Sequence, residues 1–348
     1  MNHILIGTLE QGGAERQVSY LSREDFIDSV FSFSNSNFYQ IPKHKTILSK
    51  LHMNKFALLL LAPLFIARII RKGDTIISFM EMSNIINILT KIFKKHKAVI
   101  SIRTNLNRFN RGFVRSFFLK LILFLYRYAD LVVINSEEGK RILIDLGLSD
   151  KKIKVLPNAL DLSSVVNLQS KEKVSKRIIF CGRFNKIKNI SGLLNVFKAL
   201  IRKDSEFKLY MIGDGPLRSN IEDFIYENGL SGNITLVGLQ KNPFKYFNPG
   251  SILLLTSFNE GLPNVLIEAL ACGLPVISSD CKTGPREIIA DKYGVLLPIP
   301  ISSKEFDQWA IKILETSKNY AEFSKLSLER AEDYELRSIM NKWRLLIT

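Results

Sequence analysis

Short apolar runs alternate with longer amphipathic segments along the first 160 residues. The short runs are rich in β-branched residues and have the length of strands: 2–7, 29–33, 75–78, 98–102, 131–134 and 153–156. Apolar positions at helical spacing separate most of them, at 14–21, 55–71, 84–94, 111–128 and 137–146. Strands that alternate with helices predict a parallel, doubly wound sheet, and near-continuous apolar strands predict that both of its faces are covered.

The same alternation restarts after a polar stretch at 158–176, which is typical of a linker. It predicts strands at 177–181, 208–212, 234–237, 252–256, 275–278 and 295–297, with helices at 190–201, 216–227 and 263–272, a short helix from 285 and a helical tail from 303. We therefore expect an α/β protein of two Rossmann-like domains, 1–160 and 161–334, facing a cleft. A last helix at 335–348 is expected to pack back on the first domain. Ligands of such sheets bind at the carboxyl ends of the strands.

Charge adds to this picture more than composition does. The 348 residues suffice for two full cores, and 46% hydrophobic with 24% charged residues are ordinary globular values. The net charge of +16 is concentrated, since no acidic residue stands between Glu81 and Asp130. Residues 111–128 predict a basic amphipathic helix, a type that lies on anionic membrane surfaces. Two other interpretations stay open: a core helix with a solvated basic face, and a phosphate-binding face for nucleic acid.

Other segments bear on the compartment. The apolar run 56–70 contains Arg68 and is short for a bilayer span, so we expect a buried helix. The first residues predict a strand rather than a signal peptide. Cys181, Cys272 and Cys281 form no CxxC pair and are typical of buried thiols in a reducing compartment.

The segment 257–268 carries the strongest chemical signal. Glu260 and Glu268 flank Pro263, which is expected to occupy the first position of a helix. The N–H groups of a first helical turn, together with the helix dipole, bind phosphate. A carboxylate on each side of that phosphate suits a nucleotide sugar, which has hydroxyls at both ends.

Weaker signals follow other strands. Arg183 and Lys188 stand on a strand-to-helix loop and are expected to neutralise a diphosphate, whereas Lys186 is expected to be solvated. Gly12 and Gly13 follow the first strand and let a ligand approach the backbone. The loop with Gln240 stands where a base edge is read by backbone groups. The four histidines are scattered without metal-ligand spacing, so no metal site is expected.

Taken in chain order, the motifs at 12–16, 182–188, 213–216, 260–268 and 279–287 resemble those of the retaining glycosyltransferases of family 4, which have the GT-B fold. The resemblance implies that Glu260 holds the donor sugar and Glu268 binds the ribose hydroxyls. It also implies that Arg183 and Lys188 bind the diphosphate and stabilise the leaving charge without a metal ion.

The resemblance assigns further contacts to the donor. Backbone amides near Gly261, Leu262, Asn264 and Val265 are expected to help bind the diphosphate. Gly12 and Gly13 would leave room for phosphate and acceptor. Arg103 stands where relatives often carry a histidine that contacts the donor sugar. An arginine cannot act as a base at neutral pH, but it can donate hydrogen bonds to a sugar or a phosphate.

These implications define one leading function and two alternatives. The leading function is transfer of a hexose or N-acetylhexosamine from a UDP-sugar, with no further cofactor, to a polyprenyl-diphosphate-linked glycan. The enzyme would act in surface polysaccharide or glycoprotein glycan synthesis, as a cytoplasmic protein peripheral on the inner face of the cell membrane. The alternatives are a GT-B sugar-nucleotide epimerase and a basic nucleic-acid-binding protein.

Overall fold

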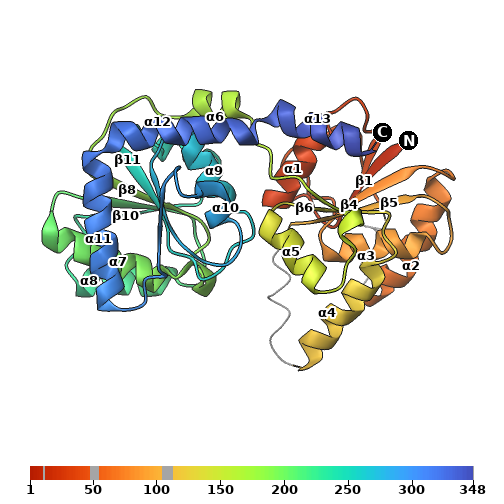
Figure 1. Cartoon of the computed structure of the whole chain (residues 1–348), viewed down its shortest axis with the longest axis horizontal. Coiled ribbons are helices and arrows are strands. Elements are labelled where there is room, and N and C mark those ends of the chain that lie inside the picture. The colour runs from red at the N-terminus through yellow and green to blue at the C-terminus, as the bar shows by residue number, and fades with distance from the viewer. Residues whose placement is uncertain (11, 48–54, 104–112, 348) are drawn as a thin grey trace. The chain divides into compact units, whose positions relative to one another are not determined.

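The computed structural model describes residues 1–10, 12–47, 55–103 and 113–347, which form two compact units (Figure 1). The first unit comprises Met1–Ala159 and the residues from Leu336 onward, and the second comprises Leu160–Glu335. The sequence analysis placed the corresponding boundaries after residues 160 and 334.

The sheet of the first unit has seven parallel strands in the order β3-β2-β1-β4-β5-β6-β7. The strands are β1 (Asn2–Ile6), β2 (Ser29–Ser32), β3 (His44–Thr46), β4 (Thr75–Phe79), β5 (Lys97–Ile102), β6 (Leu131–Ile134) and β7 (Ile153–Val155). The order of connection reverses between β1 and β4, which is the point where doubly wound sheets open a crevice for ligands.

Helices cover both faces of this sheet (Figure 1). They are α1 (Gly13–Leu21), α2 (Lys55–Ile69), α3 (Glu81–Thr90), α4 (Phe113–Tyr126), α5 (Glu137–Asp145) and α13 (Leu336–Ile347). The last of them returns to the first unit, where Ile339, Met340 and Trp343 share one buried core with Ile4 and Ile6 of β1.

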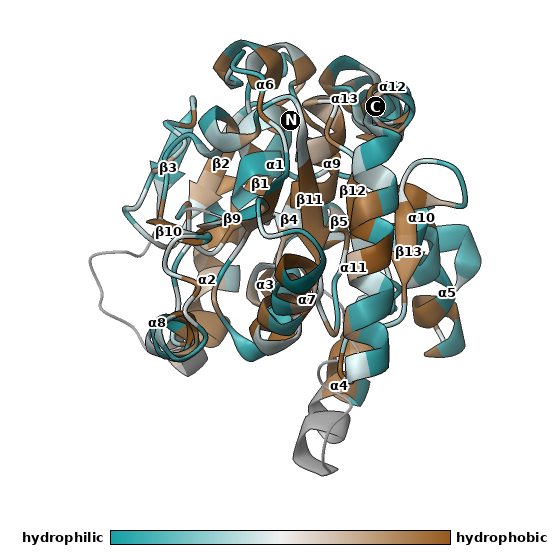
Figure 2. Ribbon diagram, turned by 90° about the vertical axis from the view of Figure 1, so that its left-hand side faces the viewer, coloured by the Kyte–Doolittle hydropathy of each residue, from teal (hydrophilic) through white to brown (hydrophobic). Residues whose placement is uncertain are grey.

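The second unit has a sheet of six parallel strands in the order β10-β9-β8-β11-β12-β13. The strands are β8 (Arg177–Cys181), β9 (Lys208–Ile212), β10 (Ile234–Gly238), β11 (Ser251–Leu255), β12 (Val276–Ser279) and β13 (Val295–Leu297). The helices are α6 (Leu162–Leu168), α7 (Ile190–Lys203), α8 (Arg218–Glu227), α9 (Asn264–Ala271), α10 (Pro285–Ile289), α11 (Ser303–Lys318) and α12 (Tyr320–Ala331). Inner strands such as β11 are mainly hydrophobic in Figure 2, whereas the edge strand β3 is hydrophilic. Hydrophobic inner strands agree with sheets covered on two faces.

The structure corrects three details of the sequence analysis. Pro263 does not begin α9 but precedes it as the N-cap, because its ψ of 105° is extended rather than helical. The stretch 158–176 is not only a linker, since it contains α6, which the Asp161 carboxylate caps at the Ser164 N–H. The prediction that 56–70 is buried is wrong for one side of α2, where Leu61 and its neighbours are exposed.

Candidate functional site

The central strands of the second sheet bring two chemically rich loops together. β8 and β11 are neighbours in the sheet, and the order of connection reverses between them. The loop after β8 contains the 3₁₀ helix η4 (Lys186–Lys188). The Phe258 N–H in the loop after β11 donates to the Ile187 carbonyl at 2.8 Å, and the Thr256 hydroxyl donates to the Lys188 carbonyl at 3.0 Å. The two loops are therefore held side by side at the edge where ligands of such sheets bind.

An ion pair joins these loops. The Lys188 ammonium nitrogen lies 2.6 Å from Oε1 of Glu260, and the two side chains are only 18% and 12% exposed. The Ser257 hydroxyl lies 2.5 Å from the same Oε1. No hydrogen bond to the other oxygen, Oε2, is present within the described residues. The Glu260 carboxylate is thus held through Oε1, whereas Oε2 can accept a hydrogen bond from a ligand.

Hydroxyl groups fix the segment that carries Glu260. The Thr283 hydroxyl donates to the backbone carbonyls of Glu260 and Gly261, and the Ser279 hydroxyl donates to the Ser257 carbonyl at 2.6 Å. Sequence reasoning gave the side chains of Ser257, Ser279 and Thr283 no role of their own, although Ser279 and Thr283 belong to the motif at 279–287. The one signal that could have found them is their position at the carboxyl ends of β11 and β12.

Gly284 is required where the loop after β12 meets the same segment. Its φ is +30°, and a Cβ there would stand 2.1 Å from the Gly261 carbonyl oxygen. Any other residue would push the two loops apart. The Gly261 carbonyl is therefore covered by the loop after β12, and the segment around Glu260 has little freedom to move.

Arg183 is placed differently from Lys188. Its side chain is exposed and makes no ion pair with a described carboxylate, whereas the neighbouring Phe184 is fully buried. The loop that carries it is fixed, since the Phe184 N–H donates to the Asp214 carbonyl at 2.9 Å. A Cβ on Gly213 would stand 2.0 Å from the Gly182 carbonyl oxygen, so this close approach needs glycine. The structure thus holds Arg183 at the surface on an ordered loop.

The other predicted donor contacts surround α9 and β10. Glu268 lies in the second turn of α9 and is 6% exposed. Within the described residues no side chain caps this helix, because the ring of the N-cap residue Pro263 has no hydrogen-bond acceptor. Leu262 is buried in the core, and Asn264 and Val265 form the first turn of α9.

Gln240 lies on the loop after β10, two strands from β8 in the sheet order. Its side-chain N–H donates to the Val237 carbonyl at 3.1 Å. The structure therefore places Gln240 at the same edge of the sheet as Lys188, and its side-chain amide bonds to the end of β10.

Cys281 lies buried near this cluster. Burial, together with the negative charge of Glu260, raises the pKa of its thiol to about 11. The thiol is therefore protonated at neutral pH, as is typical of a buried cysteine.

In the first unit, the predicted glycines form the start of α1. Gly12 is the N-cap, and its carbonyl accepts a hydrogen bond from the Tyr39 hydroxyl at 3.0 Å. The Glu15 carboxylate folds back against Gly12, 2.2 Å from where a Cβ would stand. Burial raises the pKa of Glu15. The N-terminus of α1, which begins at Gly13, thus has a carboxylate of its own beside it.

Arg103 is tied into the first unit. Its Nε donates to the Ser101 hydroxyl at 2.9 Å, and Nη1 donates to the Asn158 side chain at 2.8 Å and to the Leu156 carbonyl at 3.2 Å. The guanidinium also lies 5.8 Å from the ring centre of Trp343. Burial lowers its pKa to about 9, which still leaves it charged at pH 7. Within the described residues, Nη2 is buried without a hydrogen-bond partner and is the one group of Arg103 left for a ligand.

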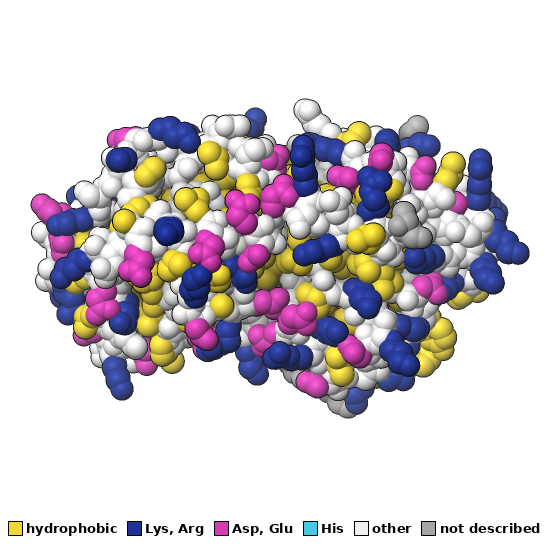
Figure 3. Space-filling model, turned by 45° about the horizontal axis from the view of Figure 1, so that its top comes forward, with side chains coloured by type: hydrophobic (Ala, Val, Ile, Leu, Met, Phe, Trp, Pro, Cys, Tyr) yellow, Lys and Arg dark blue, Asp and Glu magenta, His cyan; other side chains and the backbone are white. Residues whose placement is uncertain are grey.

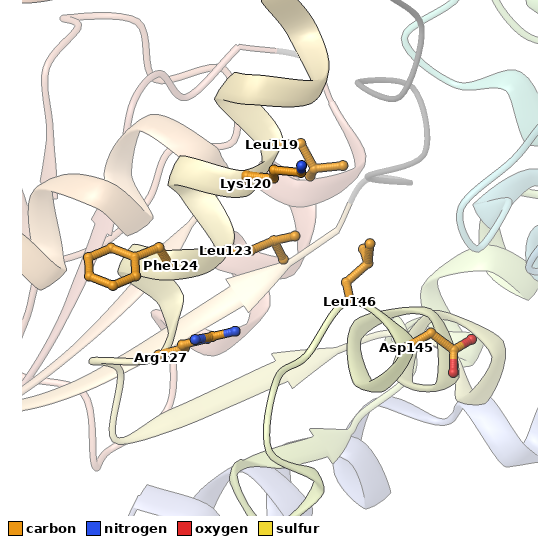
Figure 4. Close-up of a pocket in the computed structure, with 7 residues that line it drawn as sticks. All are labelled: Leu119, Lys120, Leu123, Phe124, Arg127, Asp145 and Leu146. Atoms are coloured by element: carbon orange, nitrogen blue, oxygen red, sulfur yellow. The ribbon is translucent and has the colours of Figure 1, made fainter. Parts of the chain in front are cut away.

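A pocket of about 450 Å³ lies between α4 and the end of α5 in the first unit (Figure 4). Leu119, Leu123 and Leu146 give it an apolar lining, and its charged residues are the cations Lys120 and Arg127 and the carboxylate Asp145. On the face drawn in Figure 3, by contrast, basic side chains are dispersed among acidic ones.

The described residues contain neither a candidate metal site nor a candidate membrane-spanning helix. No three His, Cys, Asp or Glu side chains in that part of the chain are grouped so as to hold a metal ion. In the same residues, no helix has both the length and the apolarity needed to cross a bilayer.

Comparison with known proteins defines the class. A family model described as glycosyl transferases group 1 matches residues 167–330, and one described as glycosyltransferase family 4 matches residues 11–164. An uncharacterized glycosyltransferase of Methanocaldococcus jannaschii is 31% identical over 81% of this chain and 81% of its own length. The chain therefore belongs to the family 4 glycosyltransferases.

A named relative and a solved structure are also similar. The N-acetylgalactosamine-N,N'-diacetylbacillosaminyl-diphospho-undecaprenol 4-alpha-N-acetylgalactosaminyltransferase of Campylobacter jejuni is 30% identical over 95% of each chain. The crystal structure of Anabaena HepE in complex with UDP has a TM-score of 0.82 and 17% identity, over 99% of each chain. At this identity the likeness shows the fold, which is the GT-B fold expected from the sequence.

Proposed function

We propose that this glycosyltransferase moves a hexose or N-acetylhexosamine from a UDP-sugar to a polyprenyl-diphosphate-linked glycan, with retention of the anomeric configuration. The observation that carries the proposal is the partly buried pair of Lys188 and Glu260, 2.6 Å apart, at the carboxyl ends of β8 and β11. UDP as the donor nucleotide is supported by the UDP complex of the similarly folded HepE.

The second unit is the proposed donor-binding domain. Lys188 and the exposed Arg183 would bind the diphosphate, and charge-assisted contacts of this kind contribute about 1.5–3 kcal/mol each. Glu268 would bind the ribose, with the amides at the start of α9 and the loop of Gln240 nearby. Glu260 would hold a sugar hydroxyl through the oxygen that is not bound to Lys188.

The reaction breaks the bond between C1 of the sugar and the diphosphate oxygen. The acceptor oxygen bonds to C1 from the same face, and its proton passes to the departing diphosphate. Two cations aimed at that diphosphate stabilise the charge that develops on it. For this reason we propose that neither a metal ion nor another cofactor is needed.

The first unit is the proposed acceptor-binding domain. The name of the Campylobacter relative includes a diphospho-undecaprenol-linked glycan, and this supports a lipid-linked acceptor here. The pocket beside α4 combines an apolar lining with two cations, Lys120 and Arg127, and one carboxylate, Asp145. An apolar lining with a net positive charge suits an amphiphile that carries phosphate. Gly12, Gly13 and Nη2 of Arg103 would contact the donor or acceptor at the carboxyl edge of the first sheet.

A lipid-linked acceptor implies a place at the membrane. We propose peripheral binding to the inner face of the cell membrane through the helix α4 and the residues that follow it, where Lys120, Phe124 and Arg127 are exposed.

The test is transfer from a panel of UDP-sugars to lipid-linked oligosaccharides extracted from membranes, with products identified by mass spectrometry and the new linkage assigned by NMR. We expect one UDP-sugar to give an α-linked product, and Glu260→Gln to lower turnover at least tenfold. Acceptor-free conversion of the sugar nucleotide would instead identify an epimerase, and an inverted linkage would overturn retention.

A further inference from the structure

Helix α2 exposes one apolar row while it buries another. Ala62 and Ile66 are buried, whereas Leu61, Phe65 and Ile69 are 41%, 38% and 47% exposed. Residues four apart share one side of a helix, so the two rows lie on adjacent sides of α2. A helix that is apolar beyond its core-facing side is typical of a surface that meets a second apolar phase.

The turn that follows α3 continues this apolar surface. Ile92 is 73% exposed and Phe93 is 49% exposed. The Gly73 N–H, just after α2, donates to the Lys95 carbonyl at 3.0 Å. The Lys91 ammonium donates to the carbonyl of Tyr128, just after α4, at 3.1 Å. The turn 91–95 is therefore hydrogen-bonded to the segments that follow α2 and α4. The helices α2, α3 and α4 lie together in Figures 1 and 2.

The third group of exposed apolar residues lies on α4 and just after its end. Leu121, Phe124 and Tyr128 are 45%, 50% and 56% exposed, and the rings of Phe124 and Tyr128 are 5.5 Å apart. We call the exposed apolar residues of α2, of the turn 91–95 and of 121–128, with the cations among them, the apolar–basic face. Its exposed cations are Arg68, Arg71, Lys72, Lys95, Lys120 and Arg127.

Charge selects the occupant of this face. The sequence has no acidic residue from 82 to 129, so cations outnumber carboxylates around this segment. The carboxylates beside it are Asp130, which pairs with Lys91, and Asp145, which lines a pocket with Lys120 and Arg127. Two copies of the chain joined through this face would oppose like charges, which disfavours a dimer. An anionic bilayer offers both an apolar interior and negative phosphates, and it matches both properties of the face.

We propose that the apolar–basic face is the surface that contacts the bilayer, with Ile92 and Phe93 inserted among the lipid headgroups. The inference rests on the membrane association proposed above and extends it from α4 to α2 and the turn 91–95. Binding through three elements fixes the orientation of the first unit on the membrane, because contacts at three places prevent the rotation that contact through a single helix allows.

The experiment is flotation of the whole protein with vesicles of phosphatidylcholine that contain or lack phosphatidylglycerol. The test variant is Ile92→Asp with Phe93→Asp, and the matched control is Leu345→Asp on α13, where Leu345 is 79% exposed. We expect the wild type and the control to float with anionic vesicles, and the double variant to bind them about tenfold more weakly. All three are expected to have the same Tm and the same affinity for UDP.

The outcomes separate the two proposals. If the wild type binds anionic vesicles and the double variant binds them equally well, the three-part face is wrong although membrane association stands. If the wild type does not bind them, both are wrong. Equal binding to vesicles without phosphatidylglycerol would remove the role of the cations. A dimer of the wild type that the double variant loses would assign the face to a second copy.

Discussion

The ammonium group of Lys188 and the carboxylate of Glu260 form a partly buried ion pair, with Nζ 2.6 Å from Oε1. A diphosphate that binds Lys188 must therefore compete with Glu260. The Ser257 hydroxyl bonds to the same Oε1, so Glu260 keeps one partner when Lys188 turns to a ligand. In this pair each charge keeps the other from being buried alone.

Ser257→Ala removes the second partner of Glu260. We expect kcat to fall about tenfold, because Glu260 is left without the hydroxyl that fixes its orientation. The affinity for UDP alone should not change, since Glu260 is proposed to hold the sugar rather than the diphosphate. Steady-state kinetics and calorimetric titration with UDP measure the two effects.

Ser257→Thr keeps the hydroxyl and is expected to keep most of the activity. A loss of UDP affinity in the alanine variant would show that Ser257 supports the whole loop instead.

Gly284→Ala places a Cβ 2.1 Å from the Gly261 carbonyl oxygen, at a residue whose φ is +30°. We expect a loss of about 1–3 kcal/mol in the free energy of unfolding, from steric strain and the unfavourable backbone conformation. Activity should fall as well, because the segment with Glu260 is displaced. Urea unfolding measures the stability. Gly232→Ala is the control, since nothing lies within 4 Å of a Cβ there. Equal stability of the two variants would contradict the contact.

Glu15→Gln tests the buried carboxylate beside Gly12. Burial raises the pKa of Glu15 above its ordinary value of 4.5, so its ionised form is disfavoured in the folded state. The folded protein then binds more protons than the unfolded one above pH 4.5, and the wild type loses stability as pH rises through the raised pKa. We expect Glu15→Gln to be more stable than the wild type at pH 7 and the difference to vanish below pH 4.5. Thermal unfolding across this range measures it, and a difference that grows toward low pH would refute the sign.

Much of the fold was predictable because its strands and helices have clear periodicity. The strands β1, β4 and β5 are buried almost throughout and each contains a run of apolar residues, and alternation with helices predicts their parallel arrangement. The sequence analysis missed β3, His44–Thr46, because three polar residues carry no apolar pattern. It also missed α6, because a short helix within a polar stretch has few core positions.

The candidate site was predictable only in part. The motifs around Lys188 and Glu260 were found from their charge and spacing, but their direct contact depends on the pairing of β8 with β11, which the spacing does not encode. The hydroxyls of Ser257 and Thr283 act through short bonds to other loops, and serine or threonine at a strand end is too common to predict such a role. The contacts of Arg103 join β5 to Asn158 and to Trp343 of α13, so no local pattern reveals them.

Calorimetric titration of UDP into the wild type, Lys188→Met and Lys186→Met tests the central claim most directly. The claim is that the second unit holds the diphosphate of the donor through Lys188. Lys186 is an exposed lysine on the same 3₁₀ helix and serves as the matched control. The account predicts that Lys188→Met weakens UDP binding by about tenfold to a hundredfold, as expected for one charge-assisted contact, and that Lys186→Met binds as the wild type does. Equal affinity of all three proteins, or a loss confined to Lys186→Met, would contradict it.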